Sequence, residues 1–184
     1  MKLASVLVIM LCPVVVSGQR QKVPMEELHV DSFTLVGLTA RTTNAKEASG
    51  NGAIGQLWAR LRSEGLLARI KHRADNHIVA VYSDYESDKD GAYTYTLGAK
   101  VTSAKDVPPG MVARRTESGN YAIFTDQGGP PAQLVIGLWQ KIWSLEKASR
   151  KLRRAYRTDF EIYLDPDAND ADQKVDIYIG LRRD

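Results

Sequence analysis

Two segments of the sequence repeat the same apolar pattern 81 positions apart. In both segments the apolar residues stand at i, i+3, i+4 and i+7, a spacing that places them on one face of a helix. They are Ile54, Leu57, Trp58 and Leu61 in the first segment, and Val135, Leu138, Trp139 and Ile142 in the second. Each segment follows a loop of helix-breaking residues, at 49–52 and at 128–131. The chain therefore contains an internal duplication, which constrains its fold more than any single motif.

Predicted strands accompany both helices in the same order, one before the helix and two after it. They lie at 33–40, 77–82 and 95–98 in the first copy, and at 121–125, 160–164 and 177–180 in the second. Three strands and one helix leave too much apolar surface exposed to be stable alone. We therefore expect an α+β fold in which duplicated β-α-β-β units form one curved antiparallel sheet. Both helices would cover one face, and a cleft would follow the pseudo-twofold axis between the copies.

The N-terminal segment has the pattern of an export signal. Lys2 precedes an apolar run from Leu3 to Val16, which is long enough for a signal peptide and too short to span a bilayer. Small residues follow, and they predict cleavage before Gln19. We expect a periplasmic or secreted protein. No later segment is apolar enough to cross a membrane, so no membrane contact is expected after cleavage.

These boundaries divide the chain into three parts. Residues 1–18 are the predicted signal peptide, 19–30 a linker, and 31–184 a single domain with its copies at 31–105 and 111–184. The only cysteine, Cys12, lies in the signal peptide, so the mature chain has no thiol for disulfides, nucleophilic catalysis or metal binding.

Charge and motifs exclude several classes of function. The formal net charge of +3 favours neither nucleic acid nor a membrane as partner. The basic run at 147–157 is interpreted as the solvated end of the second helix. The histidines His29, His72 and His77 lack ligand spacing, so no metal is expected, and no sequence motif indicates a cofactor.

Side-chain alternation in the predicted strand 160–164 separates two sets of residues. Phe160, Ile162 and Leu164 form the apolar set, which we expect to pack against the helices. Glu161 and Tyr163 then share the opposite face. That arrangement would place a carboxylate and an aromatic ring on the concave surface.

The first copy has Ala80 and Tyr82 at the equivalent positions, so only the second copy carries an acid there. A carboxylate on an aromatic surface is unfavourable unless it is paired, and aromatic faces attract cations. We predict that Glu161 meets a charged ligand. The predicted ligand-binding residues are Glu161, Tyr163, Tyr82, Trp143, Tyr85 and Ala80. The alternative is a solvated strand face on which Glu161 has no role.

Seven stretches carry a family resemblance. They are Phe33–Leu38, Leu57–Trp58, Val81–Glu86, Tyr95–Gly98, Gly119–Phe124, Leu138–Trp143 and Asp159–Tyr163. In this order and spacing, across residues 30–182, they resemble the GyrI-like small-molecule-binding domains, also described as effector-binding domains of AraC-type bacterial transcription activators. The resemblance implies a duplicated β-α-β-β fold of the SHS2/GyrI-like type, related to the SOUL-type fold, with a curved, eight-stranded-like sheet and two helices. It also implies a cleft for hydrophobic, often cationic, molecules, with the family's central glutamate at Glu161 and its neighbouring aromatic at Tyr163. This chain shows no DNA-binding module, and its predicted export separates it from cytosolic relatives.

Three functions remain open at this point. The first is non-enzymatic binding of a small organic ligand, hydrophobic and possibly cationic, in the cleft. The second, implied by stand-alone relatives, is hydrolysis of reactive cyclopropane-bearing compounds, with Glu161 as general acid or water-orienting group. The third is interaction with a protein partner through the outer helix face or the basic run.

Overall fold

The computed structural model describes residues 26–148, 152–167, 169 and 171–182; the predicted signal peptide lies outside these ranges. The strands are β1 (Glu26–Val30), β2 (Thr34–Thr42), β3 (Ile78–Ser83), β4 (Tyr93–Val101), β5 (Val112–Arg115), β6 (Gly119–Gln127), β7 (Arg154–Tyr163) and β8 (Lys174–Leu181). The helices are α1 (Asn44–Ala48), α2 (Ile54–Ser63) and α3 (Pro131–Ala148), with a 3-10 turn at Leu66–Arg69. Within the described residues, no helix combines the length and apolarity needed to cross a membrane.

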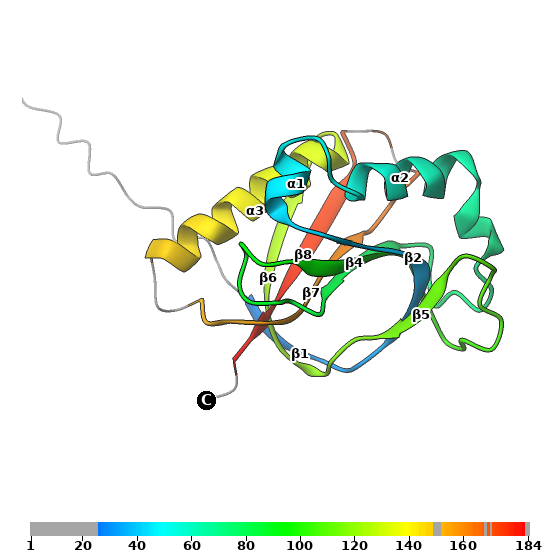
Figure 1. Cartoon of the computed structure of the whole chain (residues 1–184), viewed down its shortest axis with the longest axis horizontal. Helices are drawn as coiled ribbons and strands as arrows, with labels where there is room; N and C mark the ends of the chain where they lie inside the picture. Colours follow the sequence, from blue (N-terminus) through cyan, green and yellow to red (C-terminus); the bar gives the residue numbers. More distant parts are fainter. Residues whose placement is uncertain (1–25, 149–151, 168, 170, 183–184) are drawn as a thin grey trace, which may run out of the picture.

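All eight strands form one antiparallel sheet in the order β1-β6-β8-β7-β3-β4-β2-β5. Reversing this order and exchanging β1–β4 for β5–β8 reproduces it, so the sheet has the pseudo-twofold symmetry expected of a duplication. The three helices lie on one face of the sheet, which curves away from them at its edges (Figure 1). The predicted α+β class, the duplication and the placement of the two long helices are confirmed.

Each copy has one strand more than the residue patterns predict, as the family resemblance implies, and this strand pairs with the other copy. β1 pairs with β6, and β5 pairs with β2. Residues 26–30, expected in the linker, are therefore an edge strand of the sheet. The exchange of edge strands ties the two copies together.

The two repeated apolar patterns form α2 and α3. Leu57 and Leu61 are the buried residues of α2, and Leu138 and Ile142 are among those of α3. α3 begins at Pro131, where the missing N–H group removes no helical hydrogen bond. Both helices thus bury their predicted stripes against the sheet.

The short helix α1 fixes the start of α2. Thr43 caps α1, since its Oγ1 accepts a hydrogen bond from the Lys46 N–H at 3.2 Å. Glu47 in turn accepts hydrogen bonds from the N–H groups of Ala53 and Ile54, where α2 begins. The negative charge of Glu47 therefore stands at the helix N-terminus, where it is favourable.

The predicted faces of β7 are inverted in the structure. Phe160 is buried on the face away from the helices, where it stacks on Tyr178 with ring centroids 4.4 Å apart, and Ile162 packs against the same cluster. Glu161 and Tyr163 lie on the helix-covered face, and Leu164 follows the end of the strand. Alternation separated the two sets correctly, but both faces of this strand are buried, so apolarity alone could not identify the helix side.

The connections β1–β2 and β5–β6 lie over the face away from the helices. Phe33 and Thr116, one from each connection, are joined by reciprocal hydrogen bonds: the Phe33 N–H donates to Thr116 Oγ1, and the Thr116 N–H donates to the Phe33 carbonyl, each at 2.9 Å. The ring of Phe33 packs edge-on against Phe160, with centroids 5.3 Å apart. We call this paired contact of Phe33 and Thr116 the clasp. It helps to explain why a second apolar cluster is buried on the face of the sheet away from the helices.

Two glycines at equivalent positions, in β4 and β8, permit close contacts between neighbouring backbones. A Cβ atom built on Gly98 would lie 2.0 Å from the Val36 carbonyl oxygen, and one on Gly180 would lie 2.5 Å from the Thr158 carbonyl oxygen. Only glycine fits such an approach. Gly180 also donates its N–H to the buried Asp159 side chain at 2.8 Å, so this glycine helps to hold one side of the site described below.

Candidate functional site

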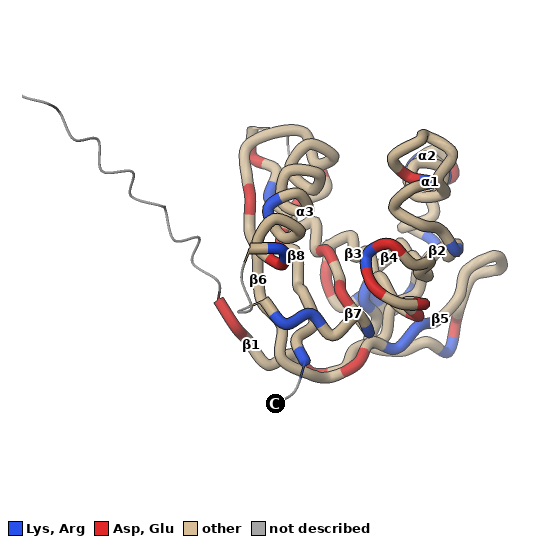
Figure 2. Tube along the Cα trace, turned by 60° about the vertical axis from the view of Figure 1, so that its left-hand side comes forward, with Lys and Arg blue, Asp and Glu red and all other residues tan. Residues whose placement is uncertain are grey.

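A cavity of about 600 Å³ lies between α2 and α3, above the middle strands of the sheet. The two helices stand apart over these strands (Figure 2), and residues of both line the cavity. Its apolar and aromatic walls come from Ile54, Trp58, Tyr82, Tyr85, Tyr93, Tyr95, Pro131, Ala132, Val135, Ile136, Trp139, Trp143 and Tyr163. The cavity therefore occupies the predicted cleft between the copies.

Glu161 lies in the wall of this cavity and is only 1% exposed. Its Oε1 accepts hydrogen bonds from Tyr82 Oη and Trp139 Nε1, both at 2.7 Å, and its Oε2 accepts from Tyr163 Oη at 2.8 Å. Burial raises the pKa of the Glu161 carboxyl, and the three hydrogen bonds oppose that shift without cancelling it. No cation of the described chain lies within ion-pair distance of it. The carboxylate is thus oriented by neutral donors and left without a counter-charge.

Tyrosine hydroxyls surround this acid and remain neutral. Burial raises the pKa of Tyr82, Tyr95 and Tyr163 well above its ordinary value, and the charge of Glu161 adds to the shift. These hydroxyls can donate to the carboxylate but cannot compete with it for a positive charge. Among the described residues that line the cavity, Glu161 is the only fully buried carboxylate.

The duplication arranges the aromatic rings in matched pairs. Trp58 packs edge-on against Tyr163 with centroids 4.8 Å apart, and Trp139 packs edge-on against Tyr82 at 5.2 Å. The tryptophan of each copy therefore contacts the tyrosine of the other. Their N–H groups differ, because Trp58 donates to Tyr95 Oη at 3.1 Å whereas Trp139 donates to Glu161.

A guanidinium group also lies over each tryptophan. Arg62 stands 5.2 Å from the ring centroid of Trp58, and Arg154 stands 5.4 Å from that of Trp139. Arg154 is buried, with its side chain 1% exposed, and Nη2 donates to Asp159 Oδ2 at 2.7 Å. Tyr85 donates to the same Oδ2 at 2.7 Å. One side of the cavity therefore rests on a buried ion pair.

Five of the six predicted ligand-binding residues line the cavity: Glu161, Tyr163, Tyr82, Trp143 and Tyr85. Ala80 does not. It is fully buried in the sheet directly opposite Glu161 on β3, where its small side chain leaves room for the acid.

Sequence reasoning missed four residues of this site. The helical spacing of Trp58 and Trp139 indicates core packing, although an indole N–H needs an acceptor when it is buried. Tyr95 lies in a predicted strand with no signal for a role in the site, and the basic run that contains Arg154 predicts a solvated helix end. Arg154 instead begins β7, after α3 ends at Ala148, and a bulge between it and Asp159 turns it inward.

Comparison with known proteins identifies the family. The family model of Cass2, integron-associated effector binding protein, matches residues 28–181. The chain belongs to the Cass2 family. The match covers both copies and all but the start of β1, so the aromatic cavity lies within the part that defines the family.

Two known proteins are similar to this chain along nearly their whole length. YobU of Bacillus subtilis (strain 168), named as a candidate transcriptional regulator, is 32% identical over 157 residues, which are 84% of this chain and 96% of YobU. An integron cassette protein from the mobile metagenome of Vibrio cholerae has a similar crystal structure. It gives a TM-score of 0.70 at 30% identity, over 86% of this chain and 95% of its own.

A more distant structure shares the fold. SAV2435, solved bound to tetraphenylphosphonium, gives a TM-score of 0.69 at 19% identity, over 86% of this chain and 93% of its own. At this identity the likeness concerns the fold alone. The resemblance to GyrI-like effector-binding domains is supported at the level of the family and its architecture.

Proposed function

We propose that this protein binds an apolar organic cation in the cavity between α2 and α3, with Glu161 as the acceptor of its positive charge. The observation that carries the proposal is a buried carboxylate held by three neutral donors in an aromatic cavity, with no cation of the described residues within ion-pair distance of it. A buried, unpaired charge is unfavourable, so a cation that enters the cavity supplies the counter-charge that Glu161 lacks in the free protein.

The aromatic walls support the same class of ligand. Aromatic faces attract cations, and the attraction grows when the site excludes water. The cavity, at about 600 Å³, falls within the range that accommodates drug-sized molecules. SAV2435, which has the same fold, was solved with the lipophilic cation tetraphenylphosphonium, so this compound is a suitable first probe.

Isothermal titration calorimetry with tetraphenylphosphonium tests the proposal. Wild-type protein should bind, and Glu161→Gln should lose roughly ten- to hundredfold in affinity, because the amide keeps the shape and loses the charge. Asp126→Asn is the matched control, since Asp126 pairs with Lys141 outside the cavity. Equal affinity of wild type and Glu161→Gln would remove Glu161 from this role.

An enzymatic alternative has one observation in its favour. Burial raises the pKa of Glu161, as a general acid requires. Against this, both oxygens of the acid already accept hydrogen bonds from Tyr82, Trp139 and Tyr163. Incubation with an electrophilic cyclopropane-bearing ester, followed by mass spectrometry, distinguishes the two functions. Product formation that disappears in Glu161→Gln would favour the hydrolase.

The place of action is part of the proposal. The apolar run from Leu3 to Val16 has signal-peptide length, and both the family match and the first described strand begin after the predicted cleavage point. We propose that the domain works outside the cytoplasm. N-terminal sequencing of the exported protein should begin at or near Gln19, whereas an intact N-terminus in a cytoplasmic fraction would overturn the assignment.

A further inference from the structure

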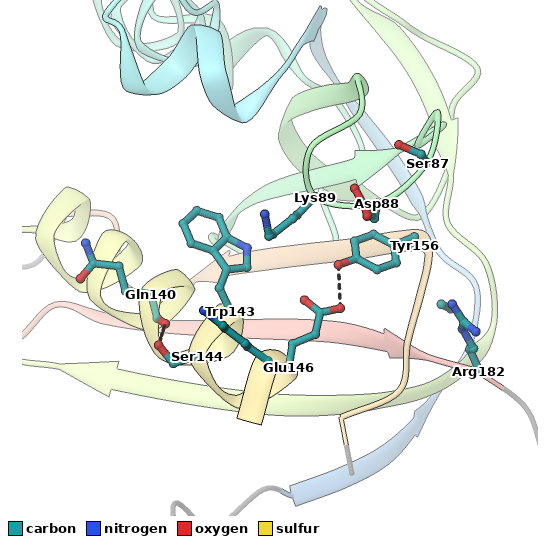
Figure 3. Close-up of a pocket in the computed structure, with 11 residues that line it drawn as sticks. Ser87, Asp88, Lys89, Gln140, Trp143, Ser144, Glu146, Tyr156 and Arg182 are labelled. Atoms are coloured by element: carbon teal, nitrogen blue, oxygen red, sulfur yellow. Dashed lines mark hydrogen bonds between the residues drawn. The ribbon is translucent and has the colours of Figure 1, made fainter. Parts of the chain in front are cut away.

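An open groove adjoins the aromatic cavity and shares part of its wall. The groove has a volume of about 1020 Å³ and lies between the C-terminal half of α3, the β3–β4 loop and the start of β7. Lys89, Gln140 and Trp143 line both the groove and the cavity. Figure 3 shows Trp143 at the side of the groove formed by α3, with its ring nitrogen turned toward Lys89. Trp143 is therefore the partition between an apolar cavity and a polar groove.

Two buried donors in this wall have no acceptor in the described part of the chain. One is Trp143 Nε1, and the other is Arg154 Nε. Both residues line the cavity, and both lie beside Trp139: its ring centroid is 6.0 Å from that of Trp143 and 5.4 Å from the Arg154 guanidinium carbon. Unpaired buried donors are rare in native proteins because each lowers stability. Two unpaired donors beside the ring of Trp139 indicate that the bound ligand supplies an acceptor.

The charge around Arg154 restricts what that acceptor can be. Nη2 donates to Asp159 at 2.7 Å, and Nη1 lies 3.5 Å from Glu146. Glu146 also accepts from Tyr156 Oη at 2.6 Å, as Figure 3 shows. Two carboxylates thus already match the guanidinium charge. A further anion would meet both, whereas an uncharged oxygen would meet only the free N–H group.

We infer that the ligand of this cavity carries, beside its cationic apolar part, an uncharged hydrogen-bond acceptor such as a carbonyl oxygen, which accepts from Trp143 Nε1 and Arg154 Nε. This inference rests on the proposed function and names the ligand class more closely. The cationic part lies against Glu161, and the acceptor lies at the end of the cavity that meets the groove. Trp143 is partly exposed, and it lines the cavity as well as the groove.

Two probes that differ only in the acceptor test the inference. They are (5-oxohexyl)triphenylphosphonium and n-hexyltriphenylphosphonium, which share the cation and the chain length. Calorimetry on wild-type protein should give about three- to tenfold tighter binding of the ketone, the gain expected from satisfying otherwise unpaired donors. Equal affinities would overturn the inference and leave the proposed function standing. Failure of both probes to bind would contradict the proposed function itself.

Trp143→Phe removes one donor and keeps an aromatic wall. The preference for the ketone should fall clearly in this variant, because Arg154 Nε alone remains of the two unpaired donors. Trp58→Phe is the matched control, because Trp58 Nε1 already donates to Tyr95, and it should keep the preference. A preference that is undiminished in Trp143→Phe would exclude Trp143 as a donor.

Two further measurements separate this role from a structural one. Without ligand, Trp143→Phe loses ring contacts but no hydrogen bond, so its unfolding temperature should fall no further than that of Trp58→Phe, which loses both. A larger fall would show that the Trp143 N–H group has a partner in the free protein and would overturn the inference. A third probe, (5-carboxypentyl)triphenylphosphonium, should bind more weakly than the ketone. Tighter binding of this carboxylate would contradict an uncharged acceptor.

Discussion

Ala80 and Glu161 are direct cross-strand partners on β3 and β7, and they are also equivalent positions of the two copies. The pseudo-twofold axis therefore passes between them. Two glutamates at these positions would stand about 5 Å apart at their Cβ atoms, with like charges opposed in a buried sheet. The duplication thus has room for one acid on its axis, and Ala80 provides that room.

The single acid should make the free protein less stable at neutral pH. Because its pKa is raised above 4.5 in the folded state, the folded protein binds the proton more tightly than the unfolded chain. The contribution of Glu161 to stability is then greatest when it is protonated, and it is lost as pH rises from about 4.5 through the folded pKa. Glu161→Gln should therefore raise the unfolding temperature without ligand at pH 7. Calorimetric scans from pH 4 to 8 check this, and a lower unfolding temperature in the variant would contradict it.

The same protonation should control binding of a cation. Below its raised pKa Glu161 is neutral and offers no charge, so affinity for tetraphenylphosphonium should weaken as pH falls toward 4.5. Titrations of wild-type protein between pH 4.5 and 8 should show this loss. In Glu161→Gln the affinity should be low and nearly independent of pH. A wild-type affinity that does not change with pH would argue against the carboxylate as the ligand's partner.

Much of this architecture follows from periodicity in the sequence. The stripes around Trp58 and Trp139 predict both long helices and the duplication, and alternation separates Glu161 from Phe160. Pattern could not identify which face of β7 the helices cover, because the clasp between Phe33 and Thr116 helps to bury the other face as well. Periodicity carries information about burial, and here both faces are buried.

The unpredicted parts depend on contacts between distant segments. β5 reads Val-Ala-Arg-Arg, and only pairing with β2 makes it a strand. Arg154 belongs to a basic run that resembles a solvated surface. Its burial follows from the bulge in β7 and from Asp159, which has no local sequence signal.

Gly55 offers a way to block the cavity without disturbing the core. It lies in α2 on the cavity wall, and a Cβ atom added there would meet no atom within 4 Å. Gly55→Leu should abolish or strongly weaken binding of tetraphenylphosphonium, with stability unchanged or raised by up to about 1 kcal/mol, since leucine favours a helix over glycine. Gly137→Leu, in α3 and also free of Cβ contacts, is the control outside the cavity lining. Unaltered binding in Gly55→Leu would place the ligand elsewhere.

Removing one partner of the buried Arg154–Asp159 ion pair should lower the stability of the fold strongly. Arg154→Met leaves the Asp159 carboxylate buried and without its cation, a change that costs about 3–5 kcal/mol. The unfolding temperature should fall by on the order of 10 °C. Arg157→Met is the control, since Arg157 forms an exposed pair with Glu117 worth less than about 1 kcal/mol. Similar small effects of both substitutions would show that the Arg154 pair is dispensable.

The two equivalent tryptophans should differ in their effect on the pKa of Glu161. Trp139 donates to Glu161 and lowers the pKa of that carboxyl, whereas Trp58 donates to the neutral Tyr95 hydroxyl. Trp139→Phe should therefore raise the pKa of Glu161 further and move the pH at which cation binding is lost to a higher value. Trp58→Phe should weaken binding through lost ring contact without moving that pH. Titration of tetraphenylphosphonium affinity against pH in both variants decides the matter. Equal midpoints would mean that the Trp139 hydrogen bond does not tune the acid, because the two rings are otherwise matched by the duplication.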